Sequence, residues 1–580
     1  MKKLSVKKAG FAGLFQTNTG ERIFNKMLQI LPYQILGSMS TVILLLVDGL
    51  VVGNFLGENA LGSVNLISPV ATFTGALCGV VGSGISISLS QAMVSVDKDA
   101  VKKVYKASIY LAIVTMLVIA ILEIPAAKLI IDSYNLDEEE LSLVWSYSSG
   151  TMISFVIAVI STIGAFILVS VGAAKKLAFL AILESAVNIF FDLLFVGVCN
   201  MGVAGAGYGT AIACTVRAIA TIVFILKSVK LFPLIKGPCL SDMITIARTG
   251  TYRLYSDTML FLKNYFITLI ILKAVGKEGF AAYSVMCFAI TIVNSLDTSV
   301  TQAVGPFNGM LTGIGEWEGG TRLLKKTLGI TFLIAAAISI ILIAFPGSVF
   351  MIYSIRDASI LQLTIVRIMA FMLVPLALNK IIQNYMTYCH MKSIASVASA
   401  FQFVIILLPL AVGLGHFTNM GAFISFVISN TLVFIATAVV YRIRIKEIAE
   451  NEKCIKYLDL TIKKSQAADF SREIEDFFME IYGDKSLANK LSVCAEEASA
   501  YLKSARKKEA TSDILYRAFK DRVVLFVLNS EIGESFLDEL IDDENVPILN
   551  NYFIMRKLSD KYSYHNICGL NSYTMIFNVC

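Results

Sequence analysis

The sequence predicts an all-α membrane protein with twelve transmembrane helices in two pseudo-symmetric six-helix lobes, followed by a small cytoplasmic α/β domain. Hydrophobic side chains make up 56% of the 580 residues and charged ones only 16%, a balance that excludes an ordinary soluble globular chain. Long apolar runs fill residues 29–445, whereas residues 447–580 have the composition of a water-soluble domain. Two domains in two different solvents are therefore expected.

The individual spans follow from run length, because a helix needs about 20 mainly apolar residues to cross a bilayer. Twelve runs satisfy this requirement: 29–52, 60–86, 104–124, 143–170, 178–198, 203–227, 250–274, 279–312, 327–347, 361–387, 394–414 and 419–442. An even number of spans places both termini on the same side.

The orientation follows from the basic residues, which gather in every second loop. Lys98 to Lys106, Lys175 with Lys176, and Arg322 to Lys326 lie in such loops. Cytoplasmic loops carry the excess of Lys and Arg, so we expect both termini in the cytoplasm. A plasma membrane, most simply a bacterial inner membrane, is the expected location, with membrane lipid around the spans.

A faint internal repeat divides the spans into two halves, since residues 55–64 after the first span resemble residues 274–285 after the seventh. Repeated bundles are a common plan for secondary transporters. The expected segments are a cytoplasmic N-terminal segment (1–28), an N-lobe (29–228), a connector with Pro233 and Pro238 (229–249), a C-lobe (250–445) and the tail domain (447–580).

The ten cysteines are scattered without CxxC spacing and do not cluster with the three histidines. No zinc site or disulfide framework is expected. Nothing in the pattern calls for a cofactor or a nucleic-acid partner, and we expect a protein that is not an enzyme.

The clearest functional candidates are acidic residues inside apolar spans, because a charge near the bilayer centre needs a partner, water or a function. Asp48 lies in the first span, and Asn188 and Asp192 lie four residues apart on one face of the fifth. Two carboxylates in a pocket of low dielectric repel, so one is expected to hold a proton or to share a cation. These three residues are the expected site for a coupling proton or sodium ion; solvation of Asp48 near the interface and helix capping by Asp192 are the alternatives.

Other charges within the spans are candidates for structural pairing or substrate contact. Glu184 lies one turn from Asn188; Arg253 and Asp257 have the spacing of an intrahelical pair. Lys263 is expected to neutralise a facing acid such as Asp297. Lys380 and Glu123 are expected to lie near helix ends and to extend toward the interface.

Several of these segments resemble the multidrug and toxic compound extrusion (MATE) family. The resemblance rests on residues 47–64, on the glycine-rich residues 79–91, on 188–192 followed by 200–210, and on 302–309. It covers residues 20–445 and implies twelve helices in two lobes and cation-driven antiport of organic compounds. It also implies that Asp48, Asn188 and Asp192 carry the coupling ion, without deciding between sodium and protons.

The tail resembles small ATP-binding domains of anti-sigma-factor and histidine-kinase type. Residues 496–501 resemble the N-box and residues 531–536 the D-x-G-x-x-F box. The positions that correspond to that nucleotide site are Glu497, Tyr501, Glu531 and Gly533. The Mg²⁺-binding asparagine is replaced by Tyr501 and the adenine-binding aspartate by Glu531, which favours a degenerate regulatory domain with a cytoplasmic partner.

These features predict an antiporter that exports amphipathic organic compounds in exchange for sodium ions or protons. Two alternatives remain: a flippase for lipids or cell-wall precursors, and a membrane-anchored sensor kinase or ATPase. The twelve spans with buried acids favour transport, since a sensor needs few spans.

Overall fold

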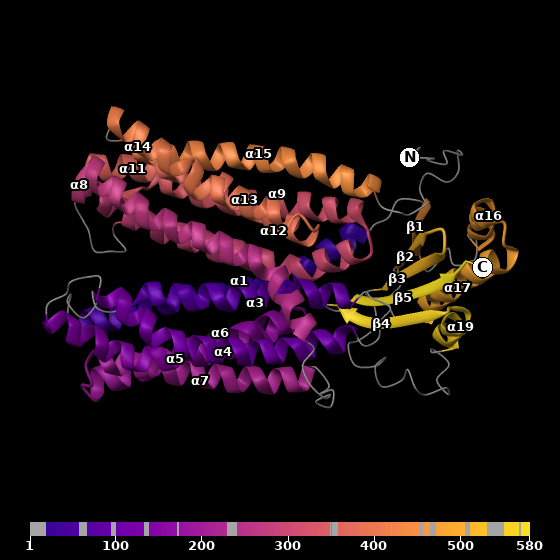
Figure 1. The fold of residues 1–580 in the computed structure, drawn as a ribbon, viewed down its shortest axis with the longest axis horizontal. Coiled ribbons are helices and arrows are strands. Elements are labelled where there is room, and N and C mark those ends of the chain that lie inside the picture. The colour runs from indigo at the N-terminus through magenta and orange to yellow at the C-terminus, as the bar shows by residue number, and fades with distance from the viewer. Residues whose placement is uncertain are drawn as a thin grey trace.

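The computed structural model describes residues 19–56, 67–93, 100–132, 138–170, 173–228, 240–347, 350, 358–418, 420–451, 456–463, 471–504, 511–529, 550–567 and 570–579. Two helical lobes lie side by side, and the strands form a smaller domain against one end of them (Figure 1). We call this end of the helical bundle the tail end, the opposite end the far end, and residues 456–579 the tail domain.

The N-lobe consists of helices whose backbone groups are satisfied within each helix, as an apolar solvent requires. They are α1 (Thr19–Leu56), α3 (Ser68–Ala92), α4 (Ala100–Asp132), α5 (Glu138–Ser170), α6 (Ala174–Asp192) and α7 (Val203–Ser228). A π-helical segment, η1 (Leu193–Val198), continues α6. Helices α5, α6 and α7 pack against one another, and α1 packs against α6.

The helices of the C-lobe have more breaks than those of the N-lobe. Its elements are α8 (Leu240–Gly313), α9 (Trp317–Ala344), α11 (Ile360–Ala370), α12 (Leu373–Tyr388), α13 (Lys392–Ala400), the π-helical η2 (Phe401–Ile405), α14 (Leu407–Phe417) and α15 (Gly421–Asn451). Its far half has a core of its own, which includes Ile271, Met286, Met369 and Phe426.

The long helix α8 contains two expected spans because it folds back on itself. Tyr252 Oη lies 3.5 Å from Asn384 Oδ1, and Lys380 Nζ lies 3.5 Å from Thr298 Oγ1. Asn384 and Lys380 are one turn apart on α12, whereas a straight helix would separate residues 252 and 298 by about 70 Å. The two limbs of α8 are therefore antiparallel and hold the expected spans 250–274 and 279–312. The helix begins at Leu240, inside the expected connector.

Among the residues that can be followed, nine helical segments are long and apolar enough to cross a membrane. They coincide with expected spans two to six and nine to twelve. The three remaining expected spans fall on α1 and on the two limbs of α8.

The lobes contact each other in the half of the bundle nearer the tail end. Ser299 Oγ of α8 lies 2.8 Å from Ser38 Oγ of α1, and α3 runs directly against α8. At Gly250 the backbones are so close that a methyl group would overlap with the carbonyl oxygen of Val80. A cluster of buried residues from both lobes fills this end and includes Met27, Leu89, Phe307 and Tyr385.

The tail domain is a five-stranded antiparallel sheet with helices on one face, as the sequence led us to expect of an α/β region. The strands are β1 (Lys456–Lys463), β2 (Thr511–Ala518), β3 (Arg522–Asn529), β4 (Lys561–Ile567) and β5 (Leu570–Asn578), in the order β1-β2-β3-β5-β4. The helices are α16 (Ser471–Tyr482), α17 (Lys485–Ser504) and α19 (Asn550–Leu558). Side chains at alternate positions of β2 and β3, such as Tyr516 and Leu525, pack with Phe478 and Leu491 of the helices.

Candidate functional site

The end of α6 holds two deeply buried polar side chains inside the N-lobe. Asn188 and Asp192 are 2% and 1% exposed, and they share one face of α6 because they lie four residues apart. The Asn188 amide lies between Asp192 and Thr210 of α7. The amide nitrogen of Asn188 donates to Asp192 Oδ2 at 3.1 Å, and the amide oxygen accepts from the Thr210 backbone nitrogen at 3.3 Å.

The backbone around Asp192 is shaped to admit its carboxylate. Gly209 of α7 lies against Asp192, and a methyl group at this position would overlap with Oδ1. The π-helical η1 starts at the next residue, Leu193; single π-helical turns within α-helices often occur at functional sites. This local geometry argues against a role for Asp192 as a simple helix cap.

The backbone of Asp48 lies in α1, but its side chain lies outside the described residues. Its level along the bundle follows from the register between α1 and α6. Ser40 contacts Ser185 at 2.8 Å, and Phe55 contacts Gly197, so the two helices run parallel with a nearly constant offset. The same offset places residue 48 level with the last turn of α6, where Asn188 and Asp192 lie.

Glu184 belongs to a separate pair rather than to this group. Its carboxylate forms an ion pair with Arg217 of α7 and accepts from Cys214 Sγ at 3.6 Å. A buried carboxylate with such a partner is satisfied within the lobe, which favours the structural role for Glu184.

A second group of charges lies between the lobes. Arg253 Nε and Asp257 Oδ2 are 3.0 Å apart, as their spacing predicted, and Arg253 faces Gly79 of α3. Lys380 of α12 interacts electrostatically with Asp257, Arg253 and Asp297. Two positive and two negative side chains therefore meet where α8, α12 and α3 converge.

The expected pairing of Lys263 with Asp297 is wrong. The charge that faces Asp297 comes from Lys380, whereas Lys263 is buried 5.8 Å above the ring of Phe403. Lys380 and Glu123 also do not extend toward an interface. Lys380 reaches the Asn294 carbonyl oxygen at 3.4 Å, and Glu123 is 3% exposed within α4. The antiparallel limbs of α8 bring Asp297 beside α12, which span boundaries alone do not reveal.

Sequence reasoning missed an uncharged network in the C-lobe. Gln402 accepts from Asn379 at 2.7 Å and from Gln383 at 3.3 Å, and it donates to Asn430 at 2.8 Å. Its position in η2 parallels that of Asp192 beside η1, since each π-helical segment lies in the fifth expected span of its lobe. The spacing of Asn379 and Gln383, four residues apart on α12, could have indicated this network, but the two side chains carry no charge.

Of the expected nucleotide positions of the tail, only Glu497 has a described side chain. Glu497 is partly exposed on α17, and burial with the neighbouring Glu496 raises its pKa. The side chain of Tyr501, and Glu531 and Gly533 altogether, lie outside the described residues.

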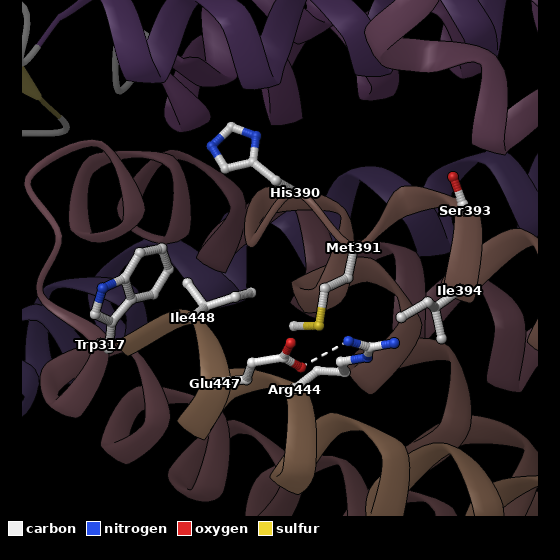
Figure 2. Close-up of a pocket in the computed structure, with 8 residues that line it drawn as sticks. All are labelled: Trp317, His390, Met391, Ser393, Ile394, Arg444, Glu447 and Ile448. Carbon is white, nitrogen blue, oxygen red and sulfur yellow. Dashed lines mark hydrogen bonds and ion pairs between the residues drawn. The ribbon is translucent and has the colours of Figure 1, made fainter. Parts of the chain in front are cut away.

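A hollow of about 590 Å³ opens where the turn between α12 and α13 meets α9 and α15 (Figure 2). Trp317, His390, Met391 and Ile448 line it, and Arg444 pairs with Glu447 at 2.6 Å on its wall. It belongs to the region where the tail domain meets the C-lobe.

Two helical lobes that contact each other toward one end, with apolar helices long enough to cross a membrane, define a multi-pass membrane fold. Comparison with solved structures identifies this fold as that of MATE transporters. An outward-facing multidrug resistance MATE transporter of the MOP superfamily matches with a TM-score of 0.66 and 20% identity, over 75% of this chain and 100% of that one. A MATE protein in a bent conformation matches with a TM-score of 0.67 and 20% identity, over 75% and 99%.

A MOP superfamily transporter from Pyrococcus furiosus, described as having a binding pocket of reverse polarity, matches with a TM-score of 0.65 and 19% identity, over 75% and 99%. The MatE family model matches residues 34–194, the stretch that contains Asp48, Asn188 and Asp192. The search of curated proteins found no significant match.

Proposed function

We propose that this chain is a MATE family antiporter, which exports amphipathic organic compounds across the plasma membrane in exchange for sodium ions or protons. The tail and both termini lie in the cytoplasm, so the tail end is the cytoplasmic end and transport proceeds by alternating opening of the two ends. The coupling ion binds in the N-lobe at Asp192, Asn188 and Asp48.

The observation that carries this proposal is the burial of Asp192 among polar groups inside a lobe that matches the MatE model. A carboxylate that is 1% exposed, bridged through Asn188 to Thr210 and fitted against Gly209, is costly to bury without a compensating ion or proton. Since Asp48 lies at the same level on the adjacent helix, the pair can exchange a proton or hold one cation between carboxylate and amide oxygens.

The position of the lobe contacts supports alternating access. They lie in the half nearer the tail end, where α3 and α8 are in backbone contact at Gly250. In the proposed orientation this conformation is closed toward the cytoplasm, and the N-lobe site must communicate with the far end before the lobes rock apart.

The test is efflux of a fluorescent organic cation from proteoliposomes under a sodium gradient and, separately, under a proton gradient. Gradient-driven efflux is expected from the wild type, and Asp192→Asn and Asp48→Asn are each expected to reduce it to the level of protein-free liposomes. Asp242→Asn, the same exchange at the first turn of α8, is the matched control and keeps wild-type efflux. Undiminished efflux in both site variants would exclude the proposed coupling site, and efflux of lipid alone would favour the flippase.

A further inference from the structure

The sheet of the tail domain is apolar on both faces. One face packs on the domain's own helices, while Leu515, Val524, Phe526 and Leu528 point the other way and belong to the buried cluster at the tail end of the bundle. Antiparallel sheets commonly leave one face in water. The second apolar face of this sheet is instead buried against residues of both lobes, so it is the surface by which the tail domain docks on the bundle.

A buried ion group lies at the centre of this surface. Arg517 of β2 points from the second face, and its Nη2 lies 2.6 Å from Glu316 Oε2 in the turn between α8 and α9. The two side chains are only 5% and 4% exposed, and Arg517 also pairs with Asp459 of β1. Without this guanidinium the Glu316 and Asp459 carboxyl groups would face each other at a buried site, so the docked contact depends on Arg517.

The turn that holds Glu316 is firmly connected to the helices that close the bundle. Glu316 Oε1 caps α9 by accepting from Gly319 N at 2.9 Å. A few residues before the turn, Gly309 of α8 lies directly against Ser90 of α3 in the other lobe. Further along α9, Thr327 meets Met27 of α1, with 3.9 Å between Oγ1 and Sδ.

We infer that the partner of the tail domain is the transporter itself: the second sheet face docks on the tail end through Arg517 and Glu316 and holds the two lobes closed there. The cluster shared by the tail and both lobes must come apart when this end opens. Undocking of the tail therefore permits the inward-open state. The docking itself does not depend on the proposed function; only the role of the open state in transport rests on it.

The group at Glu316 also gives the contact a pH dependence. Burial and the Asp459 carboxylate raise the pKa of Glu316 to about 8, although Arg517 opposes this. Docking brings Glu316 beside the Asp459 carboxylate and therefore favours the protonated form of Glu316, to which Arg517 still donates. Docking is tightest at low pH and weakens as the pH rises through 8. The other titratable groups near Glu316 are Tyr385 and Tyr457. Tyr457 also interacts electrostatically with Glu318.

Docking can be measured with full-length protein in nanodiscs through Trp317, which follows Glu316 and lines the hollow in Figure 2. The chain has two tryptophans, so Trp145→Phe leaves Trp317 as the only reporter. Arg517→Met, which keeps an apolar side chain on the docking face, is expected to raise quenching of Trp317 by acrylamide by about twofold or more, as does raising the pH from 6 to 9. Glu316→Gln, which keeps the helix cap, removes the pH dependence.

Closure is measured separately through Thr327→Cys in a background without the ten native cysteines. Arg517→Met is expected to increase alkylation of the introduced thiol severalfold, because the contact with Met27 opens. Arg472→Met on α16 is the matched control, since Arg472 is exposed and α16 packs on the other face of the sheet; it changes neither reporter. Protection of the buried Cys494 in the chain with its native cysteines verifies that the tail remains folded.

The two reporters separate the possible failures. If Arg517→Met leaves Trp317 quenching unchanged, the ion contact does not hold the tail. If quenching rises and the thiol introduced by Thr327→Cys stays unreactive, the tail docks without holding the lobes closed; either result overturns the inference. Both reporters are independent of solute efflux, so a failure here is distinct from a failure of the proposed transport activity.

Discussion

Asp192 owes its position to features of three elements. The π-helical η1 begins beside it, Asn188 of its own helix reaches the carboxylate, and Gly209 of α7 makes room for it. The acid and the amide could be predicted from the sequence because their spacing places them on one face of a helix. The role of Gly209 could not, since it depends on how closely α7 approaches α6.

Gly209→Ala provides a test that leaves every charged group in place. The added methyl group overlaps with Asp192 Oδ1, so the carboxylate must leave its position, and ion-driven efflux is expected to fall to background. Gly413→Ala is the matched control, because a methyl group there meets no atom within 4 Å. The helix propensity of alanine favours both variants equally, by about 1 kcal/mol. Wild-type efflux from Gly209→Ala would show that the exact placement of the carboxylate is unimportant.

At the scale of elements, the two lobes repeat one another in an unexpected feature. Each fifth span contains a π-helical segment, η1 beside Asp192 and η2 at Gln402. The N-lobe places an acid there and the C-lobe an amide, which hydrogen-bonds α12 and α15 to the segment. We interpret the charged version as the ion site and the neutral version as a structural joint.

The structural role of the neutral joint predicts a loss of stability. Gln402→Leu removes one buried hydrogen bond from each of Asn379, Gln383 and Asn430, and each lost partner costs about 1–3 kcal/mol. The thermal unfolding midpoint in detergent is expected to fall well below that of the wild type. Thr364→Val, at a partly exposed position of α11, is expected to have little effect. A Gln402→Leu variant as stable as the wild type would contradict this role and would favour a binding function for the network.

The sequence and the structure agree best where periodicity or run length is decisive. Spans two to six and nine to twelve coincide with helices, and β3 covers the continuous apolar run from Val523 to Leu528. Pairings between helices were predicted less well. Lys380, not Lys263, faces Asp297. This contact is set by the reversal of α8 and by the faces of α8 and α12 that meet, neither of which the sequence reveals.

At the scale of the whole molecule, the tail domain and the lobes form one continuous structure (Figure 1). The composition of residues 447–580 predicted a separate soluble domain, and the apolar character of β3 on both sides was visible in the sequence. Without knowledge of what covers the second face, however, the contact between Arg517 and Glu316 could not be predicted, because the two residues are 201 positions apart.

The central claim is that solute movement and ion movement are coupled through Asp192. Coupling is reciprocal, so the most direct measurement reverses the usual experiment: a gradient of the organic cation is imposed across proteoliposomes with no ion gradient, and internal sodium and pH are followed. We predict that the solute gradient drives one of these ions against the direction of solute flow in the wild type, and that Asp192→Asn abolishes this ion movement. Solute movement through the wild type with neither sodium nor proton movement would exclude coupled antiport.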